Sequence, residues 1–340
     1  MRLATYEHED ALCPALAVGD RLVDVGAAAQ RAGLGGDPRT LASVRALLTD
    51  RADDLERLHE AAAQLTAAGE SVALADVRLG PPIPDPGKIL CVGLNYREHA
   101  SEARLDAPEV PLIFAKFANT LIGDGAPIRL PAANARHVDY EGEVAVVIGR
   151  RVYAADERQA LEAVAGWMAF NDVSARDLQK QTSQWTVGKS PDTFGPCGPC
   201  LVLDDALRDG GLELQTRVNG ELVQQAHTDQ MIFSVARIVA FLSRTMTLVP
   251  GDIVVTGTPE GVGAHRSPAR YLGDGDVVEI TALPVVGIGG IFATNATLVL
   301  EAGAAGVAVI SAVAAAADPV GATRDLVAIV ERFRAGAFRR

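Results

Sequence analysis

The feature that most constrains this chain is the stretch Asp139–Gly149, DYEGEVAVVIG. Residues 144–148 are apolar and mostly β-branched, which predicts a buried strand. Side chains two apart on a strand point to the same face, so Glu141 and Glu143 are expected to project together. Gly142 lies between them and would let another group approach the opposite face of the strand closely.

Two carboxylates held side by side at the end of a buried strand repel each other unless a positive charge lies between them. Hard divalent cations such as Mg²⁺ and Mn²⁺ prefer oxygen ligands, so the pair is a candidate metal site. A solvent-exposed edge strand with two acidic residues is the simpler interpretation, and for an isolated Glu-x-Glu it is the commoner one. The rest of the sequence has to decide between the two.

Composition narrows the class of protein. The chain has 340 residues, of which 49% are hydrophobic and 22% charged, as in a globular protein with one large and one smaller domain. The net charge is −12 and no run is rich in lysine and arginine, so we expect no nucleic-acid partner. No apolar run is long enough to span a bilayer and no signal peptide is visible, which predicts a cytoplasmic protein with reduced cysteines and no membrane partner.

Residues 1–80 are expected to form a small N-terminal α/β domain. Apolar and polar side chains alternate in residues 2–7 and 21–25, which predicts two strands. The spacing of the leucines in residues 41–68 predicts a helix. Nothing in this part of the sequence indicates chemistry.

A proline-rich segment, residues 80–87, marks the boundary of this domain. Proline at this density disfavours helices and central strands, so we place the linker here and the catalytic domain at residues 84–300. From residue 301 to 340 the chain is an alanine-rich tail, which we expect to be peripheral and to carry one helix at residues 324–334.

The large domain is predicted to be α+β and mainly β. Asn219-Gly220 between two alternating segments indicates a hairpin. The glycine-rich loop 256–263, which contains Thr258, can bring backbone N–H groups against a small ligand. Strands are predicted at residues 88–92, 111–117, 212–218, 221–224, 252–256, 276–281 and 291–300, and helices at 156–165 and 232–245.

His99 and Glu102 are a candidate for catalysis. They are three residues apart, so on a helical turn they would share a face. A histidine oriented by a carboxylate is a common general base for activating water. An exposed amphipathic turn is an equally good interpretation of these residues alone.

Asp172 extends the set of oxygen ligands, because it comes just after the apolar segment 167–170 and Asn171, at the end of a predicted strand. Arg176 and Gln179 come shortly after it and are three apart, so they could share a face that looks back at Asp172. Lys116 lies near the end of a predicted strand and is a further candidate for substrate binding.

Two motifs in residues 188–200 are misleading. Gly188-Lys189-Ser190 resembles the end of a phosphate-binding loop, but Ser183 stands where that motif needs glycine and no strand precedes it. Cys197-Gly-Pro-Cys200 resembles a redox site, but it runs into the strand-like Leu201-Val202-Leu203 rather than a helix that would lower a thiol pKa. A non-catalytic or redox-sensing protein that uses these cysteines is the alternative to an enzyme.

Taken together, five strings resemble the fumarylacetoacetate hydrolase family, and the resemblance covers roughly residues 84–298. The resemblance implies a mixed β-sandwich or β-roll catalytic domain of this family with a small N-terminal domain. Val92 stands where the hydrolases proper carry a further carboxylate, which points to the bacterial acylpyruvase and diketo-acid branch. The matching strings, in chain order, are GLNYREHASE, HVDYEGEVAVVIG, FNDVSARDLQ, GKSPDTFGPCGP and VPGDIVVTGTPEGVG.

The resemblance also implies roles for single residues. The metal-binding carboxylates would be Glu141, Glu143 and Asp172. The water-activating pair would be His99 and Glu102, on a segment that orders when substrate binds, and Lys189 would lie near the developing oxyanion. The substrate-facing positions would be Arg176, Gln179 and Thr258, with Lys116 added from its place at a strand end. The implied cofactor is Mg²⁺ or Mn²⁺, with Ca²⁺ as a substitute in crystals, and the implied assembly is a homodimer.

These roles predict a metal-dependent hydrolase that cleaves a carbon–carbon bond in a 2,4-dioxo acid such as an acylpyruvate or fumarylpyruvate. The substrate is a small anionic 2-oxo acid, and an enolate stabilised by the metal and Lys189 would leave after water attack. The same metal site without water attack would give an oxaloacetate-type decarboxylase or a 2-hydroxy-diene-dioate isomerase. The sequence alone does not separate these reactions.

Overall fold

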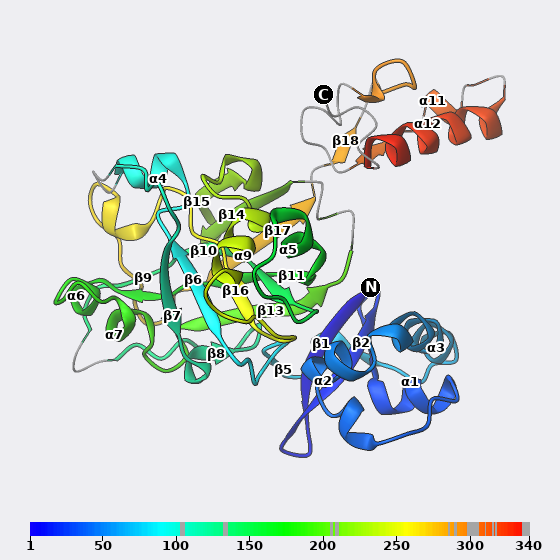
Figure 1. The fold of residues 1–340 in the computed structure, drawn as a ribbon, viewed down its shortest axis with the longest axis horizontal. Coiled ribbons are helices and arrows are strands. Elements are labelled where there is room, and N and C mark those ends of the chain that lie inside the picture. Colours follow the sequence, from blue (N-terminus) through cyan, green and yellow to red (C-terminus); the bar gives the residue numbers. More distant parts are fainter. Residues whose placement is uncertain are drawn as a thin grey trace.

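The chain is described by a computed structural model as a mixed α+β fold that is mainly β (Figure 1). One large mixed sheet forms its centre, and a smaller antiparallel sheet packs beside it. The structure describes residues 1–102, 106–131, 135–204, 207, 211–284, 286–288, 291–297, 306–309, 311–314, 316 and 318–334.

The N-terminal part is a curved sheet covered by three helices. Its strands are β1 (Arg2–His8), β2 (Ala11–Val18), β3 (Arg21–Asp24), β4 (Val72–Ala73) and β5 (Leu79–Gly80), and its helices are α1 (Val25–Arg31), α2 (Val44–Asp50) and α3 (Leu55–Ala67). The two predicted strands are confirmed, but β2 between them was missed. The single helix predicted over residues 41–68 is wrong, because the chain leaves the helix at Arg51 and forms a short 3₁₀ turn before α3.

The strands that position the candidate site lie in the middle of the large sheet. They are β6 (Ile89–Gly93), β7 (Leu112–Lys116), β8 (Leu121–Ile122), β10 (Gly142–Ile148), β11 (Val164–Asn171), β13 (Gly195–Val202) and β16 (Ile253–Val255). Within the described residues the order along the sheet is β4-β3-β2-β1-β13-β11-β10-β16-β6-β7, with β5 on β1 and β8 on β13.

Strand β10 is buried along its whole length, at all seven of its residues. Its apolar run separates two cores: Val144 and Val146 face one, and Ala145 and Val147 face the other. A strand that is buried on both faces has to be apolar at consecutive positions, which explains the run seen in the sequence. The packing on both faces therefore holds Glu143, at the polar end of the strand, in a fixed position.

The second sheet covers the polar end of β10. It contains β14 (Leu212–Val218), β15 (Glu221–His227) and β17 (Val278–Pro284), all antiparallel. The predicted turn is confirmed: Asn219 and Gly220 have φ of 53° and 79°, as a two-residue hairpin of this type requires. Helices α5 (Glu157–Glu162) and α9 (Val235–Ser243) pack together beside the sheets.

Gly142 is the contact point between β10 and this second sheet. A Cβ at this position would lie 1.9 Å from Oγ1 of Thr216 and 3.2 Å from Oε1 of Gln224. The N–H of Gly142 also donates to that Gln224 oxygen at 2.9 Å. The close approach expected from the sequence is thus present.

Replacing Gly142 by alanine is expected to lower the free energy of unfolding by about 1–3 kcal/mol, because a buried, β-branched threonine has little room to move. Denaturant unfolding followed by circular dichroism measures the change. Gly35→Ala is the matched control, because nothing lies within 4 Å of a Cβ at Gly35. Equal stability of the two variants would contradict this account of the packing.

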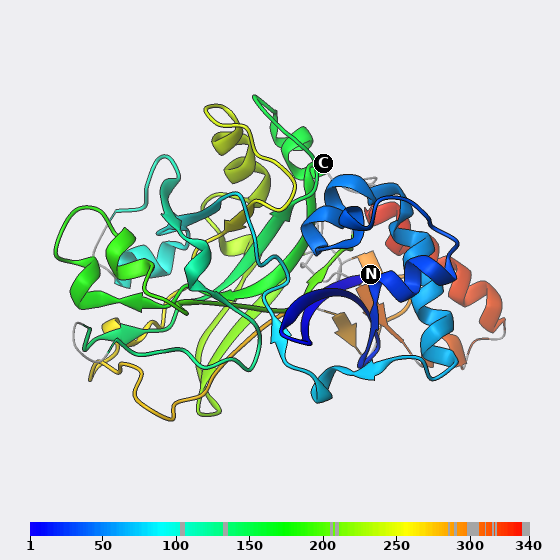
Figure 2. The ribbon, with the colours of Figure 1, turned by 90° about the horizontal axis from the view of Figure 1, so that it is seen from below.

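The N-terminal part is joined to the large sheet by hydrogen bonds. Strand β1 pairs with β13, with Leu3 opposite Leu201. One apolar core contains residues from both parts, among them Leu16, Leu58, Val147 and Phe170. Figures 1 and 2 show the N-terminal strands and helices in blue beside one end of the green central strands. The domain boundary at residues 80–84 stays a prediction.

The C-terminal part forms a small unit of its own. Its elements are β18 (Val286–Ile288), β19 (Gly306–Ala308), α11 (Ser311–Ala314) and α12 (Pro319–Arg334). The predicted C-terminal helix is confirmed, although it begins earlier. The strand predicted at residues 291–300 is wrong over 291–297, where the N–H of Phe292 donates to the Asn295 side chain and the chain turns. Residues 298–300 lie outside the described part. None of the described helices is long and apolar enough to cross a membrane.

Candidate active site

Three acidic side chains meet at the polar ends of β10 and β11. Glu141 precedes β10, Glu143 lies on it and Asp172 directly follows β11. The two strands are antiparallel, and the N–H of Asp172 donates to the carbonyl of Glu141 at 2.9 Å. All three residues are buried, and each offers an oxygen within 4.8 Å of the others. The three predicted metal ligands are therefore neighbours.

Two lysines pair with these carboxylates. Nζ of Lys189, at the end of α7 (Thr186–Lys189), lies 2.6 Å from Oε2 of Glu141 and 2.7 Å from Oδ2 of Asp172. Nζ of Lys116 lies 2.7 Å from the other oxygen of Asp172. Lys116 is completely buried behind Asp172, so in this geometry it holds the carboxylate. Its predicted contact with substrate stays a prediction.

Arg176 completes the ring of cations. It begins α6 (Arg176–Gln179), and its guanidinium lies 2.6 Å from Oε1 of Glu141 and 2.9 Å from Oδ2 of Asp139. Asp139 also accepts a hydrogen bond from the N–H of Gly263 at 2.8 Å. Sequence reasoning missed Asp139, although it opens the same acidic stretch. Asp139 therefore connects Arg176 to the glycine-rich loop through hydrogen bonds.

The charges of this cluster do not balance. Four carboxylates face three cations, and Glu143 has no ion-pair partner among the described residues; its Oε2 accepts from the N–H of Gly257. Burial, together with the charges of Asp172 and Glu141, raises the pKa of Glu143 well above its ordinary value. Burial opposes ionisation of Glu141 as well, but Lys189 and Arg176 outweigh it and hold the pKa of Glu141 below its ordinary value.

A hard divalent cation would compensate the unpaired negative charge and leave one positive charge for an anionic ligand. A carboxylate oxygen has two lone pairs, so an oxygen that already accepts from a lysine or arginine can still bind an ion. The donor set is three carboxylates, which suits Mg²⁺ or Mn²⁺ rather than a soft metal. The residues present therefore fit the implied cofactor.

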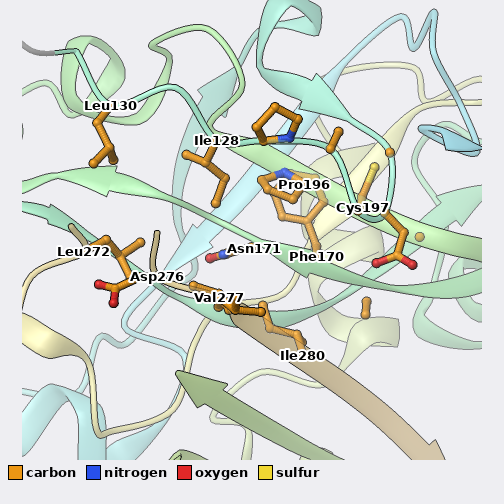
Figure 3. A pocket seen from close by; sticks show the side chains of 18 of the residues that line it. Ile128, Leu130, Phe170, Asn171, Pro196, Cys197, Leu272, Asp276, Val277 and Ile280 are labelled. Atoms are coloured by element: carbon orange, nitrogen blue, oxygen red, sulfur yellow. The ribbon is translucent and has the colours of Figure 1, made fainter. Parts of the chain in front are cut away.

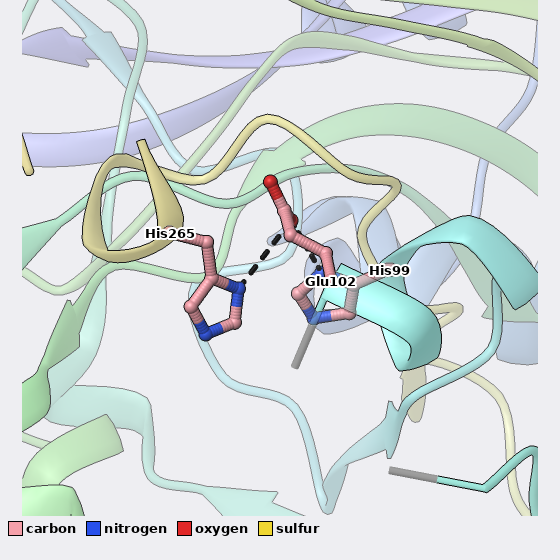
Figure 4. A group of neighbouring side chains, drawn as sticks. All are labelled: His99, Glu102 and His265. Atoms are coloured by element: carbon pink, nitrogen blue, oxygen red, sulfur yellow. Dashed lines mark hydrogen bonds and ion pairs between the residues drawn. The ribbon is translucent and has the colours of Figure 1, made fainter. Parts of the chain in front are cut away.

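His99 and Glu102 lie together on the short helix α4 (Arg97–Glu102), with Nδ1 of His99 3.6 Å from Oε2 of Glu102 (Figure 4). A second histidine, His265, lies in the short 3₁₀ turn Gly263–His265 that follows the glycine-rich loop, and it approaches the same oxygen to 3.4 Å. Burial acts to raise the pKa of Glu102, but His99, the N–H of Gly261 and His265 outweigh it and hold that pKa below its ordinary value. The sequence predicted the His99–Glu102 pair but not His265, which lies in a loop without a recognisable motif.

The two histidines, His99 and His265, line one cavity of about 320 Å³ together with Glu141 and Glu143 of the carboxylate cluster. Gln179 and Thr258 also line it, as predicted for substrate-facing residues, and Lys180 and Trp185 were not foreseen. Thr258 Oγ1 donates to the carbonyl of Gly142 at 2.9 Å, so it is held in place. The cavity lining includes Glu141, Glu143, His99, His265, Arg176, Gln179, Lys180, Lys189, Trp185 and Thr258.

A second cavity, of about 470 Å³, lies on the other side of β11 (Figure 3). Its side chains are mainly apolar, among them Ile128, Phe170 and Ile280. It contains none of the residues predicted for catalysis, metal binding or substrate binding. One residue links the two cavities: Asn171 lines the larger one and accepts a hydrogen bond from the N–H of Glu141 at 3.0 Å.

Cys197 and Cys200 both lie on strand β13, which begins earlier than the strand-like segment 201–203 seen in the sequence. Both thiols are free and buried, and burial raises the pKa of Cys197 to about 12. A thiol that stays protonated is a poor nucleophile, so the structure gives no support to the redox alternative.

Comparisons with known proteins agree with this site. Residues 88–298 match the family model described as fumarylacetoacetate (FAA) hydrolase C-terminal. The chain is 37% identical over 285 residues to a mitochondrial oxaloacetate tautomerase of Xenopus laevis, covering 82% of this chain and 86% of that one. The chain therefore belongs to the fumarylacetoacetate hydrolase family.

Solved structures are similar as well. A fumarylacetoacetate hydrolase from Exiguobacterium antarcticum has a TM-score of 0.68 at 33% identity, covering 83% of this chain and 95% of that one. A maleylpyruvate hydrolase from Sphingobium sp. SYK-6, in complex with manganese(II) and pyruvate, has a TM-score of 0.64 at 27% identity with the same coverage. The family, its relatives and the carboxylate cluster support a metal-dependent enzyme activity.

Proposed function

We propose that the chain is a divalent-metal-dependent enzyme that interconverts the keto and enol forms of a small 2-oxo dicarboxylic acid of the oxaloacetate type. The observation that carries this proposal is that Glu141 and Glu143 of the carboxylate cluster line the same cavity, of about 320 Å³, as His99 of the His99–Glu102 pair. The tautomerase from Xenopus laevis, which matches most of this chain, supports the choice of reaction.

The cavity suits a small dianion. Arg176, Lys180 and Lys189 line it and bring positive charge to a protein whose net charge is −12. A divalent ion held by Glu141, Glu143 and Asp172 would supply further positive charge to the oxygens of the bound acid and so favour its enolate. Thr258 is positioned to orient the other end of the substrate.

His99 is placed to move the proton. Its Nδ1 faces the Glu102 carboxylate, so the imidazole can take a proton from C3 of the keto acid and hold it as an imidazolium beside a negative charge. Return of a proton to the 2-oxygen gives the enol, and the reverse sequence gives the keto form. Lys189, in the same cavity, stabilises the negative charge that develops on the substrate.

Hydrolysis of a 2,4-dioxo acid is the second candidate. It needs the same enolate, but His99 would deprotonate a water that attacks the 4-carbonyl. The His99–Glu102 pair suits this step, and the similar maleylpyruvate hydrolase supports it. Decarboxylation of an oxaloacetate-type acid would also use this enolate.

Substrate assays separate these reactions. With Mg²⁺ or Mn²⁺ we expect the protein to speed the loss of the ultraviolet absorbance of enol-oxaloacetate, and EDTA to abolish the effect. His99→Gln is expected to lower that rate by about 100- to 10,000-fold, because it removes the proton carrier. His227→Gln, at a surface histidine paired with Asp229, is the control. Cleavage of acylpyruvates without tautomerisation would favour the second candidate, and a fully active His99→Gln would refute both.

We also propose that the protein forms the homodimer that the family resemblance implies. Light scattering coupled to size-exclusion chromatography measures the mass of the assembly, against 35.6 kDa for one chain.

A further inference from the structure

His99, Glu102 and His265 form a cluster with an unused ligand atom. Nδ1 of His99 is buried and has no hydrogen-bond partner in the described structure, and the side chain of His99 is 9% exposed. This nitrogen and Nδ1 of His265 both point at the Glu102 carboxylate, from two different elements (Figure 4). The two rings are 5.9 Å apart between centroids and tilted by 36°.

The spacing matches that of a tetrahedral zinc ion. Zinc binds histidine nitrogen and carboxylate oxygen at about 2.0–2.2 Å, so two ligands of a tetrahedral ion lie roughly 3.3–3.6 Å apart. The two histidine nitrogens lie 3.6 and 3.4 Å from Oε2 of Glu102, and the candidate ligand atoms all lie within 4.8 Å of one another. Only small side-chain movements are needed to surround an ion.

The chemistry of the donors separates this cluster from the carboxylate site. Two imidazoles and one carboxylate favour a borderline cation such as Zn²⁺, whereas three carboxylates favour Mg²⁺ or Mn²⁺. Glu102 and His265 are 23% and 28% exposed, so an ion can reach them from solvent. His99 and His265 both line the cavity, which leaves a fourth position for water or a substrate oxygen.

We propose that His99, Glu102 and His265 form a second metal site that binds Zn²⁺ and inhibits the enzyme. A bound Zn²⁺ would occupy Nδ1 of His99 and the Glu102 carboxylate, which the proton transfer needs. The inhibition rests on the proposed function, but zinc binding does not. The alternative is that His265 only holds Glu102 in place through its 3.4 Å contact.

Zinc stoichiometry tests the proposal without turnover. Isothermal titration calorimetry with Zn²⁺ would be run on the wild type, Glu143→Gln, His265→Ala and the Glu143→Gln/His265→Ala double variant. We expect two zinc ions per chain in the wild type, one in each single variant and none in the double variant. His227→Ala is the matched control and should keep both, because His227 pairs with Asp229 at 3.1 Å but belongs to no group of three possible ligands among the described residues.

A spectroscopic measurement on Glu143→Gln tests the proposed zinc site without the His265→Ala variant. Co²⁺ in a tetrahedral site with two nitrogen ligands absorbs visible light strongly, whereas octahedral Co²⁺ with oxygen ligands absorbs weakly. We expect the strong band in Glu143→Gln and its loss when one equivalent of Zn²⁺ is added. A Glu143→Gln protein that binds no zinc and shows no such band would overturn the proposal, as would zinc binding that His265→Ala leaves unchanged. Activity on oxaloacetate decides the proposed function separately.

Discussion

Replacing Glu143 by glutamine is expected to lower turnover by about 100- to 1000-fold, the usual loss when one electrostatic contact to a transition state is removed. Glutamine has nearly the same shape but no charge, so it weakens the divalent-ion site without opening a cavity. The loss of turnover is measured with enol-oxaloacetate at saturating Mn²⁺. The weaker binding of the ion is measured by calorimetric titration with Mn²⁺. Full activity would contradict the role of Glu143.

The metal-free stability of this variant provides an independent check. Glu143 is the buried carboxylate without a cationic partner among the described residues, so Glu143→Gln should not lower the melting temperature of the EDTA-treated protein. Asp172→Asn is the matched comparison, because Asp172 pairs with Lys116 and Lys189. That variant removes the carboxylate that pairs with the buried Lys116 and one of the two that pair with Lys189, and it should lose about 3–5 kcal/mol of stability. Similar destabilisation of both variants would contradict the charge imbalance.

Lys189→Ala is expected to cost about 100- to 1000-fold in turnover, because the ammonium stabilises the negative charge on the substrate. It should also lower the free energy of unfolding of the metal-free protein by about 3–5 kcal/mol, since two buried carboxylates lose a shared partner. Added Mn²⁺ should recover part of that stability but not the activity. Denaturant unfolding with and without Mn²⁺ measures this.

Lys180→Ala is the control for stability. Lys180 lines the same cavity but is exposed, so its removal should change the free energy of unfolding little. If Lys189→Ala were as stable as Lys180→Ala in EDTA, the ion pairs described for Lys189 would not contribute to the fold.

The carboxylate cluster could be predicted from the sequence because it depends on local geometry. The two-residue period of a strand places Glu141 and Glu143 on one face, and the apolar run beside them requires burial on both sides. Asp172 ends the neighbouring strand, so one pairing brings it into place. In the same way, Asn219-Gly220 specified its hairpin through backbone conformation alone.

Contacts between distant segments could not be predicted in this way. Lys116 and Asp172 are 56 residues apart, and their strands β7 and β11 are not neighbours in the sheet, so no local pattern predicts their contact. His265 lies in a loop without a periodic pattern, so nothing in the sequence places it opposite Glu102. Over residues 291–297 the expected strand is wrong because a side-chain hydrogen bond at Asn295 favours a turn over an apolar strand.

The central claim is that three buried carboxylates bind one divalent ion. A crystal structure of the protein soaked in Mn²⁺, with anomalous scattering data, tests it most directly. The expected result is one peak at coordination distance, roughly 2.0–2.6 Å, from an oxygen of each of Glu141, Glu143 and Asp172. Three carboxylates that keep only their protein partners, with no peak among them, would contradict it.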